Sequence, residues 1–236
     1  MISNINITPI KNMLKSALNI HNFSFKSHTS TAIIGANGAG KSTLINTILG
    51  IREDYNVKAQ NNNISYHNNI IPQRKQLGVV SNLFNYPLGL SANDLLKFYQ
   101  FFYKNCTLDL FEKNLLNKTY EHLSDGHGQK QCLKIDLALS HHPQLVIMDE
   151  PETSLEQNAL IRLSNLISLR NTQQLTSIIA THDPIVLDSC EWVLLLKNGN
   201  IVQYKPLNSI LKSVAKTFNF KEKPTTKDLL ALLKDI

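Results

Sequence analysis

Residues 35–43 combine glycines, a lysine and two hydroxyl side chains, a combination suited to binding phosphate groups. The segment fits the pattern G-x-x-x-x-G-K-[ST], and its members are Gly35, Ala36, Asn37, Gly38, Ala39, Gly40, Lys41, Ser42 and Thr43. Glycine permits backbone angles that are closed to other residues and lets N–H groups approach phosphate oxygens. We therefore expect Lys41 to reach the β- and γ-phosphates of a nucleotide, and Ser42 to place its hydroxyl on Mg²⁺.

The residues on either side predict the strand and the helix that such a loop requires. Residues 31–34 are a short apolar run of β type, and residues 43–49 form a helical segment that Gly50 would end. A helix N-terminus directly after the loop adds partial positive charge where an anion binds. This setting favours a phosphate-binding loop over a glycine-rich turn that matches the pattern by chance.

Two carboxylates follow a second apolar run, at residues 145–148. A parallel strand that ends at Asp149 would deliver this carboxylate to the sheet edge where nucleotides bind. We expect Asp149 to hold Mg²⁺, directly or through water, opposite Ser42. Glu150 is suited to polarise a water molecule for attack on the γ-phosphate. The upstream phosphate loop disfavours the alternative, in which the two acids only cap a loop before Pro151.

The composition predicts a soluble globular protein of a reducing compartment. The 236 residues are 42% hydrophobic and 18% charged, and no apolar run approaches the length of a membrane span. The N-terminus shows no secretion signal. Three widely spaced cysteines, Cys106, Cys132 and Cys190, indicate free thiols. The net charge of +6 comes from scattered lysines, so we do not expect nucleic acid as a partner.

Apolar strands alternate with helical segments along the chain. Strands are expected at residues 2–7, 18–25, 31–34, 64–66, 76–80, 145–149, 176–180, 192–196 and 200–204, with a loop or edge hairpin at 52–63. Helices are expected at 43–49, in two pieces within 91–117, after Gly126 to about Ser140, from 155 to 167, from Pro184, and at 207–218 and 226–235. This alternation predicts an α/β fold with a mostly parallel, doubly wound sheet.

Residues 123–127, Leu-Ser-Asp-Gly-His, complete an ordered set of four motifs. The others are the phosphate loop, the strand that ends in Asp149-Glu150-Pro151, and a lone His182 after another strand. In this order the motifs resemble those of the ATP-binding cassette (ABC) family of ATPases, over roughly residues 1–205. The resemblance implies a single ABC ATPase domain at 1–236. It implies the P-loop NTPase (RecA-like) fold, whose core is a mostly parallel sheet, together with an antiparallel β subdomain. It also implies a reduced helical subdomain at about 83–135 and a C-terminal helical tail at about 206–236.

The same resemblance implies ATP and Mg²⁺ as ligands and a head-to-tail pair of cassettes. Ser124 and the Gly126 amide would contact the γ-phosphate bound to a second copy or to a paralogous cassette, again using a helix N-terminus. His182 would hold the γ-phosphate and the attacking water, and would act with Glu150 and Lys41 in catalysis. The metal ligands implied are Ser42, Asp149 and Asn82, the last in place of a glutamine that usually ends a strand.

Some positions depart from the family pattern. Asp125 and His127 replace a glycine and a glutamine of the family motif. The Asp125 carboxylate would repel the phosphate that this segment meets, and a protonated His127 imidazole would partly compensate this repulsion. Asn82 keeps the amide at a shorter reach, and Gln73 is the alternative for that position. Residues 8–13 contain no clear counterpart of the aromatic side chain that stacks on adenine.

Two classes of function, and one variant of an ABC cassette, are consistent with these features. The first is the ATP-binding subunit of a membrane transporter, cytoplasmic and peripheral on the inner face of the cell membrane, with an integral permease as a separate chain. Residues 91–99 favour an exporter. The second is a soluble cassette that acts on nucleic acid or a protein complex, slightly favoured by the basic charge. The variant is a regulatory cassette that binds ATP but hydrolyses it weakly, motivated by Asp125 and Asn82.

Overall fold

Two sheets and the helix between them position the phosphate loop. The structure is a computed structural model that describes residues 3–9, 18–61, 64–67, 76–103, 106–108, 112–124, 126, 128–218, 220 and 222–234. The strands in these residues are β1 Ser3–Pro9, β2 Ile20–Phe23, β3 Ser30–Ile34, β4 Tyr55–Asn61, β5 Ile64–His67, β6 Leu77–Val80, β7 Leu145–Asp149, β8 Thr176–Ala180, β9 Trp192–Lys197 and β10 Asn200–Pro206. The α-helices are α1 Lys41–Ile48, α2 Ala92–Phe102, α3 Gln129–Leu139, α4 Gln157–Thr172, α5 Pro184–Asp188, α6 Leu207–Thr217 and α7 Thr226–Lys234.

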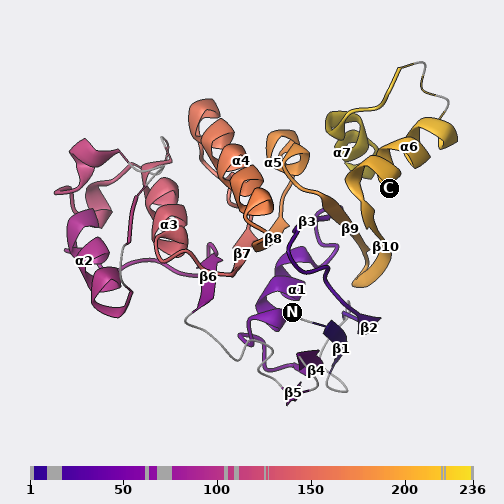
Figure 1. The fold of residues 1–236 in the computed structure, drawn as a ribbon, viewed down its shortest axis with the longest axis horizontal. Helices are drawn as coiled ribbons and strands as arrows, with labels where there is room; N and C mark the ends of the chain where they lie inside the picture. The colour runs from indigo at the N-terminus through magenta and orange to yellow at the C-terminus, as the bar shows by residue number, and fades with distance from the viewer. Residues whose placement is uncertain are drawn as a thin grey trace.

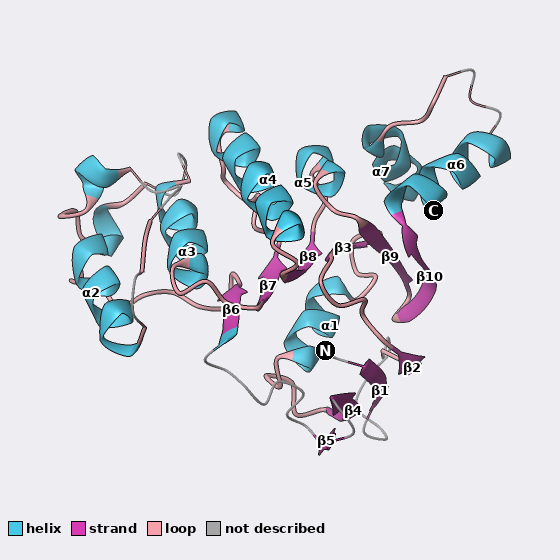
Figure 2. Cartoon of the chain, in the orientation of Figure 1, coloured by secondary structure: helices cyan, strands magenta, loops and turns pink. Residues whose placement is uncertain are grey.

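The larger sheet has the order β10-β9-β3-β8-β7-β6, and the smaller has the order β2-β1-β4-β5. In the larger sheet, every neighbouring pair from β9 to β6 runs parallel, while β10 returns antiparallel to β9. The pairs of the smaller sheet are antiparallel. Helix α1 lies between the two sheets, and α3, α4 and α5 lie on the other side of the larger one (Figures 1 and 2). The predicted α/β fold with a parallel core and an antiparallel subdomain is confirmed.

Side chains of the larger sheet point alternately into two hydrophobic cores, as the pleat of a strand requires. Ile33 belongs to the core that contains α1 and the smaller sheet, whereas Ala32 and Ile34 belong to the core under α3, α4 and α5. Ile147 and Val146 divide between the two cores in the same way. Strands buried on both faces read as continuous apolar runs, which is why these segments were recognisable in the sequence.

The region from residue 91 to 117 differs from the prediction of two helices. Helix α2 begins at a capping box, in which Ser91 and Asp94 bond each other's backbone N–H groups. Between α2 and residue 117, the only helical element among the described residues is a 3₁₀ turn, Lys113–Leu115. The carbonyls of Leu116 and Lys118 accept hydrogen bonds from the backbone N–H groups of residues 93 and 92 at the start of α2. Within the turn, the Leu115 N–H donates to the carbonyl three residues earlier, as in a 3₁₀ turn and not as in an α-helix.

Candidate functional site

The phosphate loop runs from the end of β3 to the start of α1 and is braced from outside by the β9–β10 hairpin. Gly40 begins α1 with φ of 105° and Gly38 has φ of 79°, angles that favour glycine. A Cβ at Gly35 would lie 2.3 Å from the Leu196 carbonyl oxygen, so the loop touches β9 backbone there. The hairpin turn also bonds the loop, because the Gly199 N–H donates to the Ala39 carbonyl at 2.9 Å.

Lys41 is held inside this loop. Its ammonium group donates to the carbonyl oxygens of Gly35 and Ala36, at 3.0 and 3.3 Å. Burial lowers the pKa of Lys41, and the negative charges of Glu150 and Asp149 oppose that shift. The cation is thus partly desolvated and paired with backbone carbonyls, an arrangement from which it can turn to phosphate oxygens.

Ser42 and Asp149 meet at the sheet edge, as the sequence predicted. The Ser42 hydroxyl donates to Asp149 Oδ1 at 3.1 Å, although the two residues are 107 positions apart. Burial raises the pKa of Asp149, while the hydrogen bond from Ser42 lowers it. A hydroxyl and a desolvated carboxylate are hard oxygen ligands of the kind that Mg²⁺ takes alongside phosphate oxygens. The residues present therefore fit a magnesium ion.

Glu150 and His182 form the next part of the site. The structure brings His182 Nε2 to 3.6 Å from Glu150 Oε1, and both side chains are more than one third exposed. Glu150 has a φ of 48°, in the left-handed region that is uncommon for residues other than glycine. Its N–H donates to the Ala180 carbonyl at 2.9 Å, which ties the turn after β7 to the end of β8. Backbone held in this region is often found at functional sites.

Asn82 lies at the same edge of the sheet. It follows β6 by two residues, and β6 pairs with β7 in a register that places Val80 beside Met148. The turn exposes Asn82 to solvent. The alternative residue, Gln73, lies outside the described residues, as do Asp125, His127 and most of the segment 8–13.

The segment around Ser124 and Gly126 differs from the prediction that a helix begins directly after Gly126. Helix α3 begins at Gln129, and its N-cap is Gly128 with φ of 66°. The Ser124 carbonyl accepts from the Gln129 N–H at 3.1 Å, and the Gln129 side chain accepts from the Ser124 N–H at 3.1 Å. The N-terminus of α3 therefore begins at Gly128, and the Ser124 carbonyl already accepts from the N–H groups of Gln129 and Lys130, while Ser124 and exposed Gly126 lie in the loop before the helix.

Helix α3 is fixed directly to the loop that follows Asp149. A Cβ at Gly128 would lie 2.5 Å from the Ser154 carbonyl oxygen and 3.1 Å from Leu155 Cα. The Gln131 side chain donates to the Pro151 carbonyl at 3.0 Å and is buried. Neither residue belongs to a motif that the sequence predicted. Two glycines two positions apart, at 126 and 128, were the only local signal that the helix had two possible starts.

The assembled site has the parts of a nucleotide-hydrolysing centre, and known proteins agree with this interpretation. A family model described as ABC transporter matches residues 18–153, more than half of the chain. The chain belongs to this family. It is accordingly an ATP-binding subunit and an ATPase.

Individual relatives extend the match beyond residue 153. A putative ABC transporter ATP-binding protein of Pyrococcus abyssi is 28% identical over 228 residues, covering 88% of this chain and 84% of the relative. The energy-coupling factor transporter ATP-binding protein EcfA of Methanococcus maripaludis is 31% identical over 210 residues, covering 79% of this chain and 72% of the relative. The ATP-binding cassette MJ0796, solved as a dimer bound to ADP and phosphate, shares the fold with a TM-score of 0.71 at 23% identity, covering 87% of this chain and 97% of that one.

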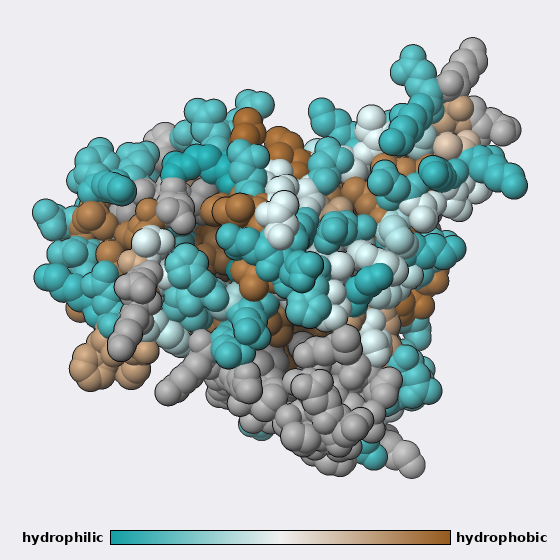
Figure 3. All heavy atoms as spheres, viewed as in Figure 1, coloured by the Kyte–Doolittle hydropathy of each residue, from teal (hydrophilic) through white to brown (hydrophobic). Residues whose placement is uncertain are grey.

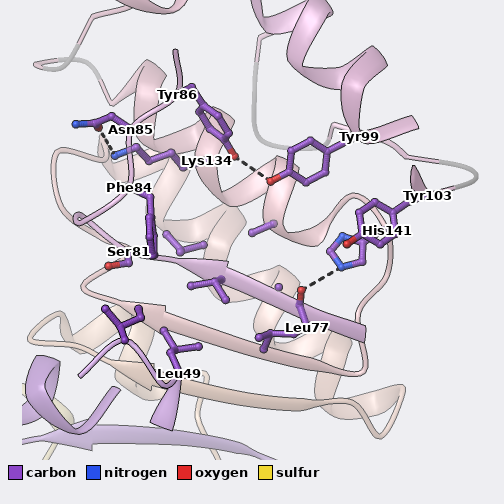
Figure 4. A pocket seen from close by; sticks show the side chains of 15 residues that line it. Leu49, Leu77, Ser81, Phe84, Asn85, Tyr86, Tyr99, Tyr103, Lys134 and His141 are labelled. Carbon is purple, nitrogen blue, oxygen red and sulfur yellow. Dashed lines mark hydrogen bonds between the residues drawn. The ribbon is translucent and has the colours of Figure 1, made fainter. Parts of the chain in front are cut away.

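A cavity opens in this cassette between β6, α2 and α3, next to the Asn82 turn (Figure 4). Its volume is about 440 Å³, and apolar and aromatic side chains dominate its lining. The Tyr86 and Tyr99 hydroxyls lie 3.3 Å apart across it, and His141 Nε2 lies 3.3 Å from the Leu77 carbonyl. None of the residues that line the cavity belongs to the phosphate loop, although Leu49 and Ile51 follow α1 directly.

Several large apolar side chains are exposed close to this cavity. They are Leu83, Phe84, Leu88, Phe98, Phe101 and Phe102, with exposures from 51% to 83%. Figure 3 shows hydrophobic residues at the surface over this α2 end of the molecule. Apolar side chains gathered in this way mark surfaces that other proteins or membranes cover. Within the described parts of the chain, no helix has the length and apolar character that a membrane crossing requires.

Proposed function

We propose that this cassette binds ATP with Mg²⁺ and hydrolyses it to drive a membrane transporter whose permease is a separate chain. The observation that carries the proposal is the meeting of the phosphate loop, Asp149 and the Glu150–His182 pair at one sheet edge. Ser42 and Asp149 are 3.1 Å apart, and Glu150 and His182 are 3.6 Å apart. The parts come from the ends of three parallel strands, with the phosphate loop after β3, Asp149 and Glu150 at the end of β7, and His182 after β8, where α/β proteins bind their ligands.

The phosphate loop binds the triphosphate through its backbone N–H groups and the N-terminus of α1. Lys41 leaves the Gly35 and Ala36 carbonyls and donates to the β- and γ-phosphates instead. Ser42 and Asp149 hold Mg²⁺, with Asn82 beside them at the sheet edge. The metal ion, when bound, neutralises charge that develops on the phosphate oxygens. The exchange of carbonyl partners for phosphate partners keeps Lys41 fully hydrogen-bonded in both states.

Glu150 polarises the attacking water, and His182 holds that water and the γ-phosphate. At a separation of 3.6 Å, both side chains are within reach of one water molecule that lies beside them. Their exposure suits groups that meet a ligand from outside the chain. Removal of the Glu150 carboxylate should therefore affect hydrolysis far more than nucleotide binding.

The site is completed by a second cassette, either an identical copy or a paralogue. Ser124 and Gly126 of one copy meet the γ-phosphate bound to the other, and the N-terminal amides of α3 lie directly behind them. The dimeric cassette bound to ADP and phosphate supports this arrangement as a relative of the same fold. ATP binding closes the pair, and hydrolysis reopens it.

The permease docks on the exposed apolar residues near the α2 cavity. This surface belongs to the proposed helical subdomain at about 83–135, within a single ABC ATPase domain whose helical tail occupies about 206–236. Binding there would hold the cassette on the cytoplasmic face of the cell membrane. Relatives are named for methionine import, tungstate uptake and zinc import, so the export direction favoured by residues 91–99 gains no support from them.

Glu150→Gln tests the proposed chemistry, with exposed Glu222→Gln in the tail as the matched control. We expect Glu150→Gln to lose at least about 100-fold in Mg²⁺-dependent phosphate release while ATP affinity stays within about threefold. The trapped variant should elute as a dimer with ATP and as a monomer without it. Hydrolysis at the control's rate would remove Glu150 from its role, and a monomer with bound ATP would remove the paired site.

Co-purification from membranes tests the transporter assignment. We expect the chain to be retained with an integral membrane protein and to be released when Phe101 and Phe102 are both changed to serine. A chain that stays in the soluble fraction of the cells and binds no membrane protein would instead support the soluble class of cassette.

A further inference from the structure

Glu152 follows Pro151 directly and reaches across to the loop that carries His182. Its Oε1 accepts a hydrogen bond from the Thr181 hydroxyl at 2.7 Å and a second from the His182 backbone N–H at 2.7 Å. These contacts join residues 29 and 30 positions apart in the chain. The carboxylate thus binds the backbone of the residue whose imidazole lies beside Glu150.

The contacts continue beyond Thr181 into α5. The Thr181 hydroxyl accepts from the Asp183 N–H at 3.0 Å, and the Asp183 side chain caps α5 through the Ile185 and Val186 N–H groups. Thr181 itself is fully buried. The His182 backbone is therefore held on both sides, by a capped helix after it and by a carboxylate from the neighbouring strand loop.

Burial makes this carboxylate costly, which argues against a merely solvated acid. Burial raises the pKa of Glu152, and its two hydrogen bonds oppose that shift. Among the described residues, Glu152 Oε2 is buried with no hydrogen-bond partner. An unpaired buried acceptor costs free energy, and the two hydrogen bonds at Oε1 offset that cost.

We propose that Glu152 is a positioning residue for hydrolysis, which fixes the distance between the His182 imidazole and the Glu150 carboxylate. The inference rests on the proposed function, because it assigns Glu152 a role in the same reaction. Glu152 touches neither the phosphate loop nor the Ser42–Asp149 pair through any hydrogen bond in the described residues. Its contacts with Thr181 and His182 act on the chemical step, while its negative charge is among those that oppose the lowered pKa of Lys41.

Glu152→Ala and Glu152→Gln separate this role from a general contribution to folding. Alanine removes both acceptor contacts, and we expect kcat to fall about 10–100-fold, since a misplacement near 1 Å costs up to that much. KM and ATP affinity should stay within about threefold. Glutamine keeps an acceptor at Oε1, so it should restore kcat to within about threefold of the unchanged chain. A purely structural loss would lower the fraction of chains that bind ATP and leave kcat per bound ATP unchanged.

A second pair keeps the test decisive if Glu152→Ala does not fold. Thr181→Val removes one donor to Glu152 without changing the carboxylate, and Thr181→Ser keeps it. We expect the valine variant to lose about 3–10-fold in kcat, because it removes one of the two hydrogen bonds to Glu152 and also the acceptor of the Asp183 N–H. The serine variant keeps both bonds and should lose little. Equal rates for valine and serine would overturn the proposal.

A double-mutant cycle with His182→Ala tests whether Glu152 acts through His182. Single-turnover phosphate release with enzyme in excess gives a measurable rate for the slow variants. In the His182→Ala background, Glu152→Ala should cause no further loss, because its target is already absent. A further loss of tenfold or more would overturn the positioning role. Failure of the proposed function shows separately, as a Glu150→Gln variant that still hydrolyses ATP.

Discussion

The phosphate loop offers a sharp comparison, because two of its glycines are needed for different physical reasons. Gly35 is needed for space, since a Cβ there would lie 2.3 Å from the Leu196 carbonyl oxygen, well inside ordinary contact at 3.4 Å. Gly38 is needed for conformation, since its φ is +79° and no atom lies within 4 Å of an added Cβ. The same change to alanine therefore imposes a clash at one position and only backbone strain at the other.

The two costs can be estimated from these contacts. Gly35→Ala must push the backbone of β9 or the loop aside, which places it near the upper end of the overpacking range, about 3 kcal/mol. Gly38→Ala costs about 1 kcal/mol, the lower end of the penalty for an L-residue in the left-handed region. In a chain of this size, 1 kcal/mol shifts Tm by about 2–4 °C. We therefore expect Tm to fall by about 6–12 °C for Gly35→Ala and about 2–4 °C for Gly38→Ala.

Differential scanning calorimetry without nucleotide is the assay, because it separates folding from any effect on ATP binding. Titration with a fluorescent ATP analogue then follows the loop itself, and we expect Gly35→Ala to weaken binding at least about tenfold. Equal Tm values for the two variants, or a Gly35→Ala variant as stable as the unchanged chain, would refute the contact between the loop and β9.

Three further changes test other parts of the molecule. Asp149→Asn should raise the free energy of unfolding at neutral pH without Mg²⁺, because burial raises the pKa of Asp149. The folded chain therefore binds more protons than the unfolded chain, and it loses stability as pH rises from about 4 to about 7. Urea unfolding across this range should show that the gain in the asparagine variant vanishes at the acid end. Arg170→Met removes a buried guanidinium that donates to two carbonyls and a hydroxyl, so it should cost about 3 kcal/mol in urea unfolding, while exposed Arg162→Met should change it by less than about 1 kcal/mol. Gly128→Ala meets the Ser154 carbonyl at 2.5 Å with φ of +66°, so it should cost about 2–3 kcal/mol in the same assay, and a loss below about 0.5 kcal/mol would contradict the packing of α3 there.

Local patterns were sufficient for the phosphate loop and for the acids after β7. A strand, a glycine-rich loop and a helix lie in one continuous segment, so the spacing of Gly35, Gly40 and Lys41 carries the geometry with it. The apolar run before Asp149 likewise predicted a buried strand and the edge where its carboxylate emerges. The order of strands and helices then predicted the parallel core, because parallel strands need crossover helices between them.

The start of α3 was decided by a contact far along the chain. Composition around Gly126 and Gly128 allowed either glycine to precede the helix. Gly128 adopts φ of 66° against the Ser154 carbonyl, which only the folded loop after β7 supplies. A contact far along the chain also influences the conformation of residues 112–118, because the Leu116 and Lys118 carbonyls accept hydrogen bonds from the first turn of α2.

The chemistry of the site likewise depends partly on local sequence and partly on tertiary contacts. By itself, the sequence determined which side chains carry charge and hydroxyl groups and which strand ends present them, since both follow from residue type and local period. Only the tertiary structure decided that Glu152 bonds the backbone of His182 and that His182 lies 3.6 Å from Glu150. Those contacts join the loops after β7 and β8, which lie about 30 positions apart in the chain, and they depend on the register of two neighbouring strands, which no local pattern contains.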